Sequence, residues 1–118
     1  MSHGILIFDC HETIRRRTRA YLENAGFQIC GEAGDGQEAL AKTKVAGPAM
    51  IIMDLNGGFD LIPELLKCAP APKILIFTLH EGPEFLRLAR LLGAQGYALK
   101  SEPNGLTAEV RRLLGTTS

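Results

Sequence analysis

Four short apolar runs constrain the fold of this chain more than any other feature of its sequence. They are Ile5–Phe8 (ILIF), Met50–Met53 (MIIM), Ile74–Phe77 (ILIF) and the weaker Gly96–Leu99 (GYAL). Each run is unbroken rather than alternating with polar residues, which is typical of a strand buried on both faces in a parallel sheet. A fifth strand is expected at Phe27–Cys30, because a turn signal at Asn24–Gly26 precedes it.

The segments between the strands have helical periodicity. Apolar or small residues recur three or four positions apart in Ile14–Ala25, Ala39–Thr43, Leu61–Leu66, Phe85–Leu92 and Leu106–Leu114. Pro83 and Pro103 fit the first turns of helices, and Gly93 fits a helix end. Strands and helices therefore alternate, which predicts an α/β fold with a doubly wound, five-stranded parallel sheet and five helices. We expect a single domain over residues 1–118.

Composition narrows the class of protein. Thirteen basic residues balance thirteen acidic ones, so the net charge is zero and this segment is not expected to bind nucleic acid directly. No apolar run approaches the roughly 20 residues that cross a bilayer, and the N-terminus lacks the pattern of a signal peptide. The three cysteines form no CxxC pair. These features predict a cytoplasmic domain without membrane contact.

Polar residues directly follow four of the strands: Asp9, Asp54, Thr78 and Lys100. In a doubly wound sheet, ligands bind at the carboxyl ends of the strands, so these side chains are expected to converge. Any one of them could simply cap a helix or face solvent. Together they suit phosphoryl chemistry: two carboxylates favour a hard cation such as Mg²⁺, and a carboxylate can attack phosphorus. An ammonium and a hydroxyl would hold the phosphoryl oxygens.

Five segments carry a resemblance to a known family: ILIFDCHETIRR, GEAGDGQEAL, MIIMDLN, KILIFT and GAQGYALK. In content, order and spacing they resemble the receiver domain of bacterial two-component response regulators, over essentially the whole chain. GEAGDGQEAL and GYALK look most like the subgroup that usually carries a C-terminal helix-turn-helix. The resemblance implies a flavodoxin-like, receiver-type sheet, and the chain is expected to end where a receiver domain ends.

The resemblance also implies roles for individual residues. Asp54 would accept a phosphoryl group from a histidine kinase or a phosphotransfer protein in a phosphorelay. Thr78 would hydrogen-bond that group, and Lys100 would pair with it. Tyr97 would turn inward as Thr78 moves, so that the surface offered to a downstream partner or an output domain changes. The domain would catalyse only its own phosphotransfer and dephosphorylation, and a homodimer is possible.

The implied Mg²⁺ site departs from the family pattern. Asp9, Asp54 and the backbone carbonyl of Asn56 would be ligands, but Cys10 stands where the family has a second acid. A thiol is neutral near pH 7 and soft, whereas Mg²⁺ prefers hard oxygen. The loop Asp54–Phe59 is one residue shorter than usual, and Leu79 replaces a small residue after the threonine. We expect Mg²⁺ binding and phosphotransfer to be weakened but not abolished.

Two other interpretations stay open. The chain could be an atypical receiver-like interaction module that signals with little or no phosphorylation, since its acidic site is depleted at Cys10. The run Asp9–Thr13 also loosely resembles the first motif of haloacid-dehalogenase-type phosphatases, but His11 stands where that motif needs an acid. The arginines of the first helix are expected to form a solvated face or a docking surface for a kinase; they are Arg15, Arg16, Arg17 and Arg19.

Overall fold

A computed structural model describes residues 4–54, 59–79 and 82–115 of the chain. Five strands form one sheet: β1 (Ile5–Phe8), β2 (Ile29–Ala33), β3 (Met50–Met53), β4 (Lys73–Thr78) and β5 (Gly96–Leu99). Five helices alternate with them: α1 (Glu12–Asn24), α2 (Gly36–Ala46), α3 (Leu61–Leu66), α4 (Pro83–Leu92) and α5 (Pro103–Leu114). The predicted doubly wound parallel sheet with five helices is confirmed.

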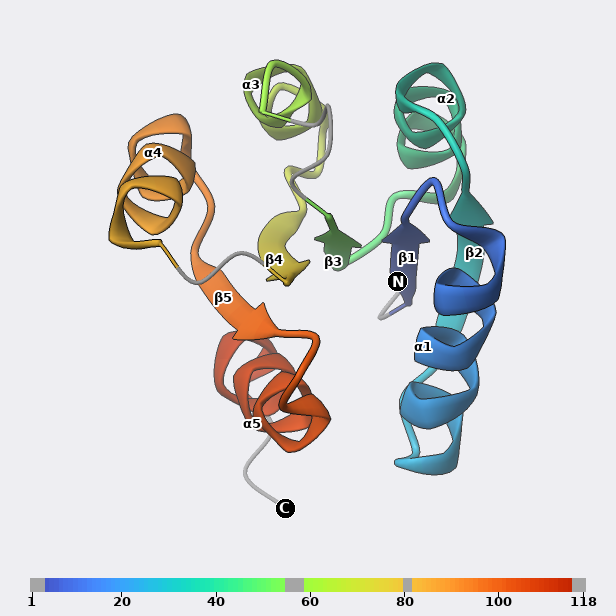
Figure 1. The fold of residues 1–118 in the computed structure, drawn as a ribbon. Helices are drawn as coiled ribbons and strands as arrows, with labels where there is room; N and C mark the ends of the chain where they lie inside the picture. The colour runs from blue at the N-terminus through green and yellow to red at the C-terminus, as the bar shows by residue number, and fades with distance from the viewer. Residues whose placement is uncertain (1–3, 55–58, 80–81, 116–118) are drawn as a thin grey trace.

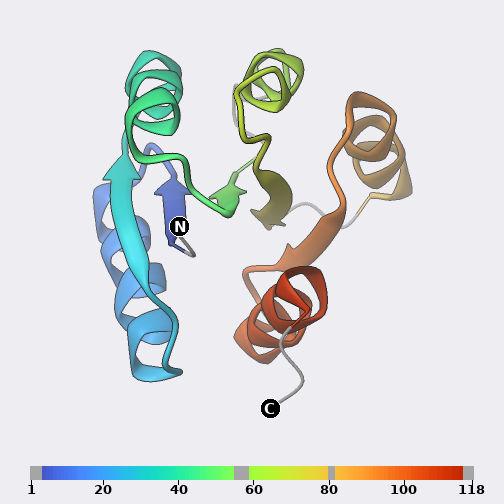
Figure 2. The ribbon, with the colours of Figure 1, turned by 180° about the vertical axis from the view of Figure 1, so that it is seen from behind.

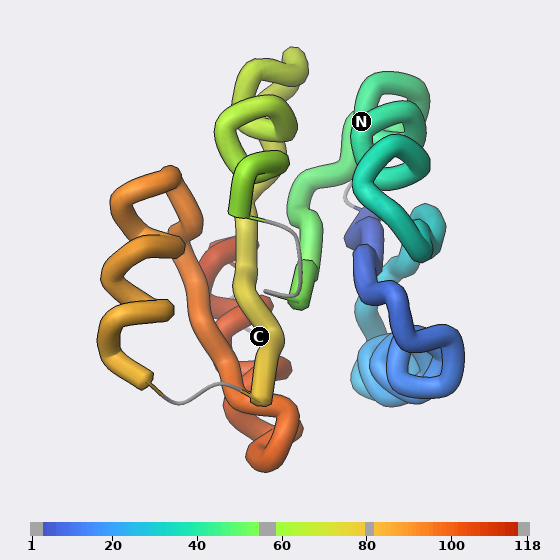
Figure 3. Tube along the Cα trace, turned by 45° about the horizontal axis from the view of Figure 1, so that its top comes forward, coloured from blue at the N-terminus to red at the C-terminus, as the bar shows by residue number. Residues whose placement is uncertain are grey.

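The order of the strands creates a switch point between β1 and β3. All neighbouring strands are parallel and follow the order β2-β1-β3-β4-β5. From β1 the chain moves to one side to form β2, then returns past β1 to form β3, β4 and β5 (Figure 3). β2 and β5 are therefore the two edges of the sheet (Figure 2). Folds of this kind bind ligands beside the switch point, at the carboxyl ends of the strands.

Helices cover both faces of the sheet. α1 and α5 lie on one face, and α2, α3 and α4 lie on the other (Figure 1). The central strands alternate between two cores: Ile7 and Ile52 pack toward α1 and α5, whereas Leu6 and Ile51 pack toward the other helices. Both faces bury apolar side chains, which explains why the strands are unbroken apolar runs. Each such buried side chain contributes about 1.5–3 kcal/mol of hydrophobic free energy.

The helix ends follow the signals in the sequence. Pro83 and Pro103 open α4 and α5, as predicted. Gly93 ends α4 with φ of +117°, a conformation that favours glycine, so the predicted stop is also confirmed. The longest helix in the described part of the chain is α1, with 13 residues. No helix described there could span a membrane, because a span takes roughly 20 apolar residues.

Two details of the prediction are wrong. The second strand is Ile29–Ala33 rather than Phe27–Cys30. This strand lies at an edge, so its middle residues include the half-buried Glu32, and the apolar pattern that marks the central strands is lost. Leu88, part of the periodic set in Phe85–Leu92, was expected to be buried together with Ala89; Ala89 is buried as expected, but 43% of Leu88 is exposed.

Candidate functional site

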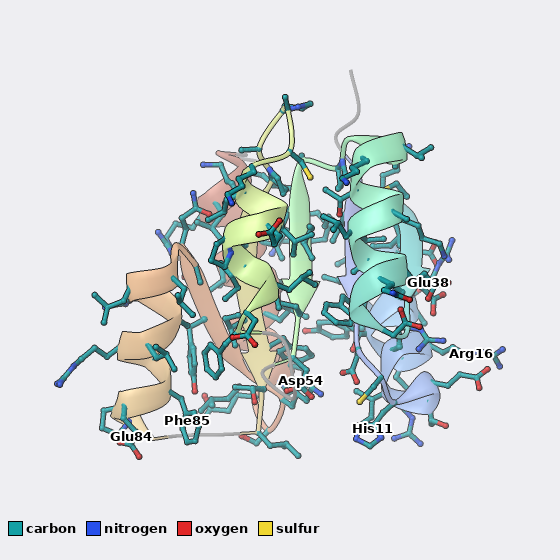
Figure 4. The ribbon with its side chains drawn as sticks, turned by 90° about the horizontal axis from the view of Figure 1, so that it is seen from above. His11, Arg16, Glu38, Asp54, Glu84 and Phe85 are labelled. Carbon is teal, nitrogen blue, oxygen red and sulfur yellow. The ribbon has the colours of Figure 1, made fainter. Side chains whose placement is uncertain are left out.

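The register of the sheet brings Asp9 and Asp54 together. Phe8 at the end of β1 is paired with Met53 at the end of β3, so the next residue of each strand leaves the sheet at the same level. Both carboxylates are nearly buried, with Asp9 5% and Asp54 8% exposed. Figure 4 shows Asp54 at the same end of the molecule as His11, which precedes α1.

Lys100 lies between the two carboxylates. It follows β5, and its Nζ donates to Asp9 Oδ2 and to Asp54 Oδ2, each at 2.7 Å. Its side chain is 8% exposed. Burial lowers the pKa of Lys100, but the hydrogen bonds and charges of Asp54 and Asp9 outweigh burial, and the pKa is raised above its usual value. Lys100 is therefore a charged ammonium that compensates two converging carboxylates.

Thr78 and Tyr97 stand close to this group in the sheet. Thr78 ends β4 and is 1% exposed, and its carbonyl oxygen accepts a 2.8 Å hydrogen bond from the backbone N–H of Lys100. Tyr97 is half-buried on the edge strand β5, where its ring packs against the core that faces α2, α3 and α4. Residue 56 lies outside the described residues, so the structure does not place the expected carbonyl ligand.

The residues after β1 fix Asp9 further. The backbone N–H of His11 donates to Asp9 Oδ1 at 2.9 Å, a contact in which an aspartate accepts from the backbone two residues later. Arg15 Nη1 donates to the Asp9 carbonyl oxygen at 2.8 Å. The prediction of a solvated arginine face is therefore wrong for Arg15, although Arg16 and Arg17 are exposed as expected. Arg15 also pairs with Glu32 on the neighbouring strand β2, with Nε 2.9 Å from Oε1, and no local sequence signal marks Arg15 out from the other arginines of α1.

The carboxylate oxygens of the site suit a hard cation, but they are few. Asp9 and Asp54 point their oxygens at one position, and Mg²⁺ is commonly held by one or two carboxylates together with water and phosphate oxygens. Cys10 is exposed and supplies a thiol rather than a third carboxylate. Over the described residues, no three His, Cys, Asp or Glu side chains are grouped in a way that could hold a metal ion.

A cavity adjoins the site on the side of α1 and α5. Its volume is about 440 Å³, and its walls include Ile14, Tyr21 and Leu106 as well as Lys100. Leu79, the residue after Thr78, also lines this cavity and is 67% exposed. The cavity is therefore mostly apolar and shares Lys100 with the site.

Comparison with known proteins gives a consistent result. Residues 5–111 match the family model described as the response regulator receiver domain. The transcriptional regulatory protein PdtaR of Mycobacterium tuberculosis is 33% identical over 100 residues, which cover 81% of this chain and 48% of PdtaR. The chemotaxis protein CheY of Thermotoga maritima is 29% identical over 104 residues, covering 85% of this chain and 87% of CheY.

A solved response regulator structure also resembles this chain over nearly its whole length. A two-component response regulator of the LuxR family from Aurantimonas sp. SI85-9A1 superposes with a TM-score of 0.90 at 30% identity, covering 98% of this chain and 86% of that one. The chain spans about half the length of curated relatives such as PdtaR. The similarity therefore applies to one domain of those longer proteins.

Proposed function

The chain belongs to the response regulator receiver domain family of two-component signal transduction, and from this premise we propose that Asp54 accepts a phosphoryl group from a phosphohistidine. Receiver domains interact with histidine kinases and with output domains. The observation that supports the proposal is the placement of Lys100, which joins the carboxylates of Asp9 and Asp54 at 2.7 Å each. A nucleophilic carboxylate and a cation for the phosphoryl oxygens are thereby held together.

The proposed transfer needs few protein groups. A carboxylate oxygen of Asp54 attacks phosphorus, the P–N bond of the donor breaks, and its electron pair stays on the histidine nitrogen. The product is an acyl phosphate on Asp54. Lys100 pairs with the phosphoryl oxygens, and the Thr78 hydroxyl donates to one of them. We propose that the chain catalyses only this transfer and the later hydrolysis of the acyl phosphate, in which water attacks phosphorus, the Asp54 carboxylate leaves and inorganic phosphate is released.

Asp9 and Asp54 would hold a Mg²⁺ ion. When bound, the ion neutralises charge that develops on the transferring group and on the two carboxylates. Because Cys10 adds no carboxylate, we propose that this site binds Mg²⁺ more weakly than receivers with an acid at that position.

Phosphorylation would be sensed through β4 and β5. It adds about −1.5 to −2 charges at Asp54. The backbone N–H of Lys100 donates to the Thr78 carbonyl oxygen, so when either residue shifts toward the new charge, the ends of both β4 and β5 should move. Tyr97 lies three residues before Lys100 on an edge strand flanked by α4 and α5 (Figure 1). We propose that this surface changes for a downstream partner or an output domain.

The phosphodonor would approach from the cavity beside α1 and α5. Lys100 is one of the residues that line this cavity, so a donor protein seated there would place its phosphohistidine beside the lysine that contacts both carboxylates. The exposed Arg17 at the rim adds positive charge for the incoming phosphoryl group.

The decisive experiment is incubation with a small acyl phosphate and Mg²⁺, followed by intact-mass measurement. We expect an adduct of one phosphoryl group that is absent from Asp54→Ala. Asp60→Ala is the matched control, because Asp60 is an exposed aspartate that caps α3 without a side-chain hydrogen bond. An adduct that survives in Asp54→Ala contradicts the proposal.

A second candidate function is an interaction module that works without phosphate. The exposed thiol of Cys10 and the engagement of both carboxylates by Lys100 favour it. Absence of any adduct on the wild-type chain, under conditions that modify an ordinary receiver, would select this alternative.

A further inference from the structure

Arg15 joins three parts of the fold with one side chain. Its Nη1 donates to the Asp9 carbonyl oxygen at 2.8 Å, directly after β1, and its Nε donates to Glu32 Oε1 at 2.9 Å, on β2. The side chain itself starts from α1 and is 17% exposed. Its neighbour Arg16 differs sharply, since that side chain is 72% exposed and pairs with Glu12 one turn away on the same helix.

The guanidinium of Arg15 is held in place from several sides. Glu32 also accepts from Arg19 Nη1 at 3.1 Å, so its carboxylate is anchored by two arginines. The backbone of Gly34 lies so close that a Cβ there would be 3.2 Å from Arg15 Nη1. Because its partners are fixed, the planar guanidinium of Arg15 can hold the backbone at Asp9 in place, which a flexible surface arginine cannot do.

We infer that Arg15 is a positioning residue for the phosphoacceptor pocket: by tying the Asp9 carbonyl to Glu32, it fixes the backbone from which the Asp9 carboxylate reaches Lys100. This inference rests on the proposed function, because it concerns the same pocket. Because Cys10 supplies a thiol rather than a carboxylate, the proposed Mg²⁺ site depends on Asp9 for its carboxylate after β1. A small displacement of Asp9 therefore costs more here, since misplacement by about 1 Å can reduce a rate about 100-fold.

Four variants separate positioning from simple ion pairing. Arg15→Ala removes the contacts of Arg15 with Asp9 and with Glu32. Arg19→Ala weakens the ion-pair cluster of Glu32 with Arg15 and Arg19, called the Glu32 cluster below, but leaves the contact with Asp9 intact. Arg16→Ala is a surface control. Arg15→Lys keeps the charge but cannot donate to both partners in the same geometry. Mg²⁺ alone is titrated calorimetrically into each protein. We expect Arg15→Ala and Arg15→Lys to weaken Mg²⁺ binding about tenfold, the size of effect seen for groups that orient metal ligands, and the other two to leave it nearly unchanged.

Two results would overturn the inference. Equal weakening in Arg19→Ala would show that stability of the Glu32 cluster matters and not the Asp9 contact. Wild-type affinity in Arg15→Lys would show that charge alone suffices. If Arg15→Ala does not fold, Gly34→Ala replaces it, because the added methyl would lie 3.2 Å from Arg15 Nη1 and shift the guanidinium by a few tenths of an ångström while keeping every charge.

A metal-free measurement separates this inference from the proposed function. The backbone amide of His11 donates to Asp9 Oδ1, so its proton chemical shift reports the position of that carboxylate. We expect the His11 amide signal to shift in Arg15→Ala and to stay in place in Arg19→Ala and Arg16→Ala. If the wild-type chain neither binds Mg²⁺ nor becomes phosphorylated, the proposed function fails, yet this pattern would still support the positioning role. An unmoved His11 signal in Arg15→Ala overturns it.

Discussion

Lys100 Nζ lies 2.7 Å from Asp54 Oδ2, although β5 and β3, the strands that the two residues directly follow, are separated in the sheet by β4. Lys100 makes the same contact with Asp9. The two carboxylates and the ammonium are each less than a tenth exposed, so each charge depends on the others for compensation. The site is thus a compact charged triad with an excess of one negative charge.

Replacing Lys100 with methionine should destabilise the fold. The substitution leaves two nearly buried carboxylates without a cation, and breaking a buried pair from one side costs about 3 kcal/mol. Urea unfolding at neutral pH measures the loss. Mg²⁺ should restore part of it, because any cation that binds only the folded state stabilises that state.

The exposed Lys73 offers a matched control, since Lys73→Met removes a lysine at the start of β4 without touching the triad. Adding Asp9→Asn to Lys100→Met should recover stability, because one of the two uncompensated charges is removed. If Lys100→Met and Lys73→Met unfold at the same urea concentration, the triad does not stabilise the fold.

Acid should weaken the Glu32 cluster. Burial raises the pKa of Glu32, but hydrogen bonds from Arg15 and Arg19 outweigh burial, and the pKa is lowered below its usual value of about 4.3. A lowered pKa in the folded state means that the stabilisation is complete above the unfolded value and is lost as the pH falls through the folded one. The free energy of unfolding of the wild type should therefore exceed that of Glu32→Gln by about 1 kcal/mol at neutral pH, and this difference should vanish in acid. Unfolding curves from pH 7 downward test this, and a constant difference would contradict it.

The central part of the fold could be predicted because its physical signals are local. Strands β1, β3 and β5 have the predicted ends, since both faces of β1 and β3 are buried and polar residues follow directly. The register that aligns Phe8 with Met53 then places Asp9 beside Asp54. Edge strand β2 was misplaced because half-buried residues such as Glu32 carry no apolar pattern.

The contact between Arg15 and Asp9 could not be predicted in the same way. Arg15, Arg16 and Arg17 are identical residues in one run, and their sequence gives no reason to separate them. The difference arises from tertiary structure, because among these three arginines it is Arg15 that pairs with Glu32 of β2. A side chain becomes a positioning group here through a partner 17 residues away in the chain.

Two glycines should respond oppositely to alanine. Gly93 has φ of +117°, and an added Cβ would clash with Leu66 Cδ1, so Gly93→Ala should lower the free energy of unfolding by about 2 kcal/mol through strain and overpacking. Gly105, in α5, has open space around its Cα, and Gly105→Ala should raise stability by about 0.5 kcal/mol because alanine favours helix. Thermal unfolding of both variants tests the pair, and stabilisation by Gly93→Ala would contradict the backbone assignment.

Cys10→Asp should strengthen Mg²⁺ binding. The new carboxylate would stand next to Asp9, at an exposed position that now holds a thiol, and would give the cation a further hard ligand. We expect affinity to rise about tenfold by calorimetry, together with a larger stabilisation by Mg²⁺ in thermal unfolding. Without Mg²⁺ the variant should be slightly less stable than wild type, because the triad already has an excess of negative charge.

Cys10→Asn is the matched control, since asparagine has the shape of aspartate but no charge. It should leave Mg²⁺ affinity close to that of wild type, because a neutral amide oxygen attracts the ion far less than a carboxylate. Equal gains in the asparagine and aspartate variants would mean that removal of the thiol is what matters. No gain in either would mean that Lys100, which already occupies both carboxylates, limits access of the cation, and Lys100→Met should then raise the affinity where Cys10→Asp does not.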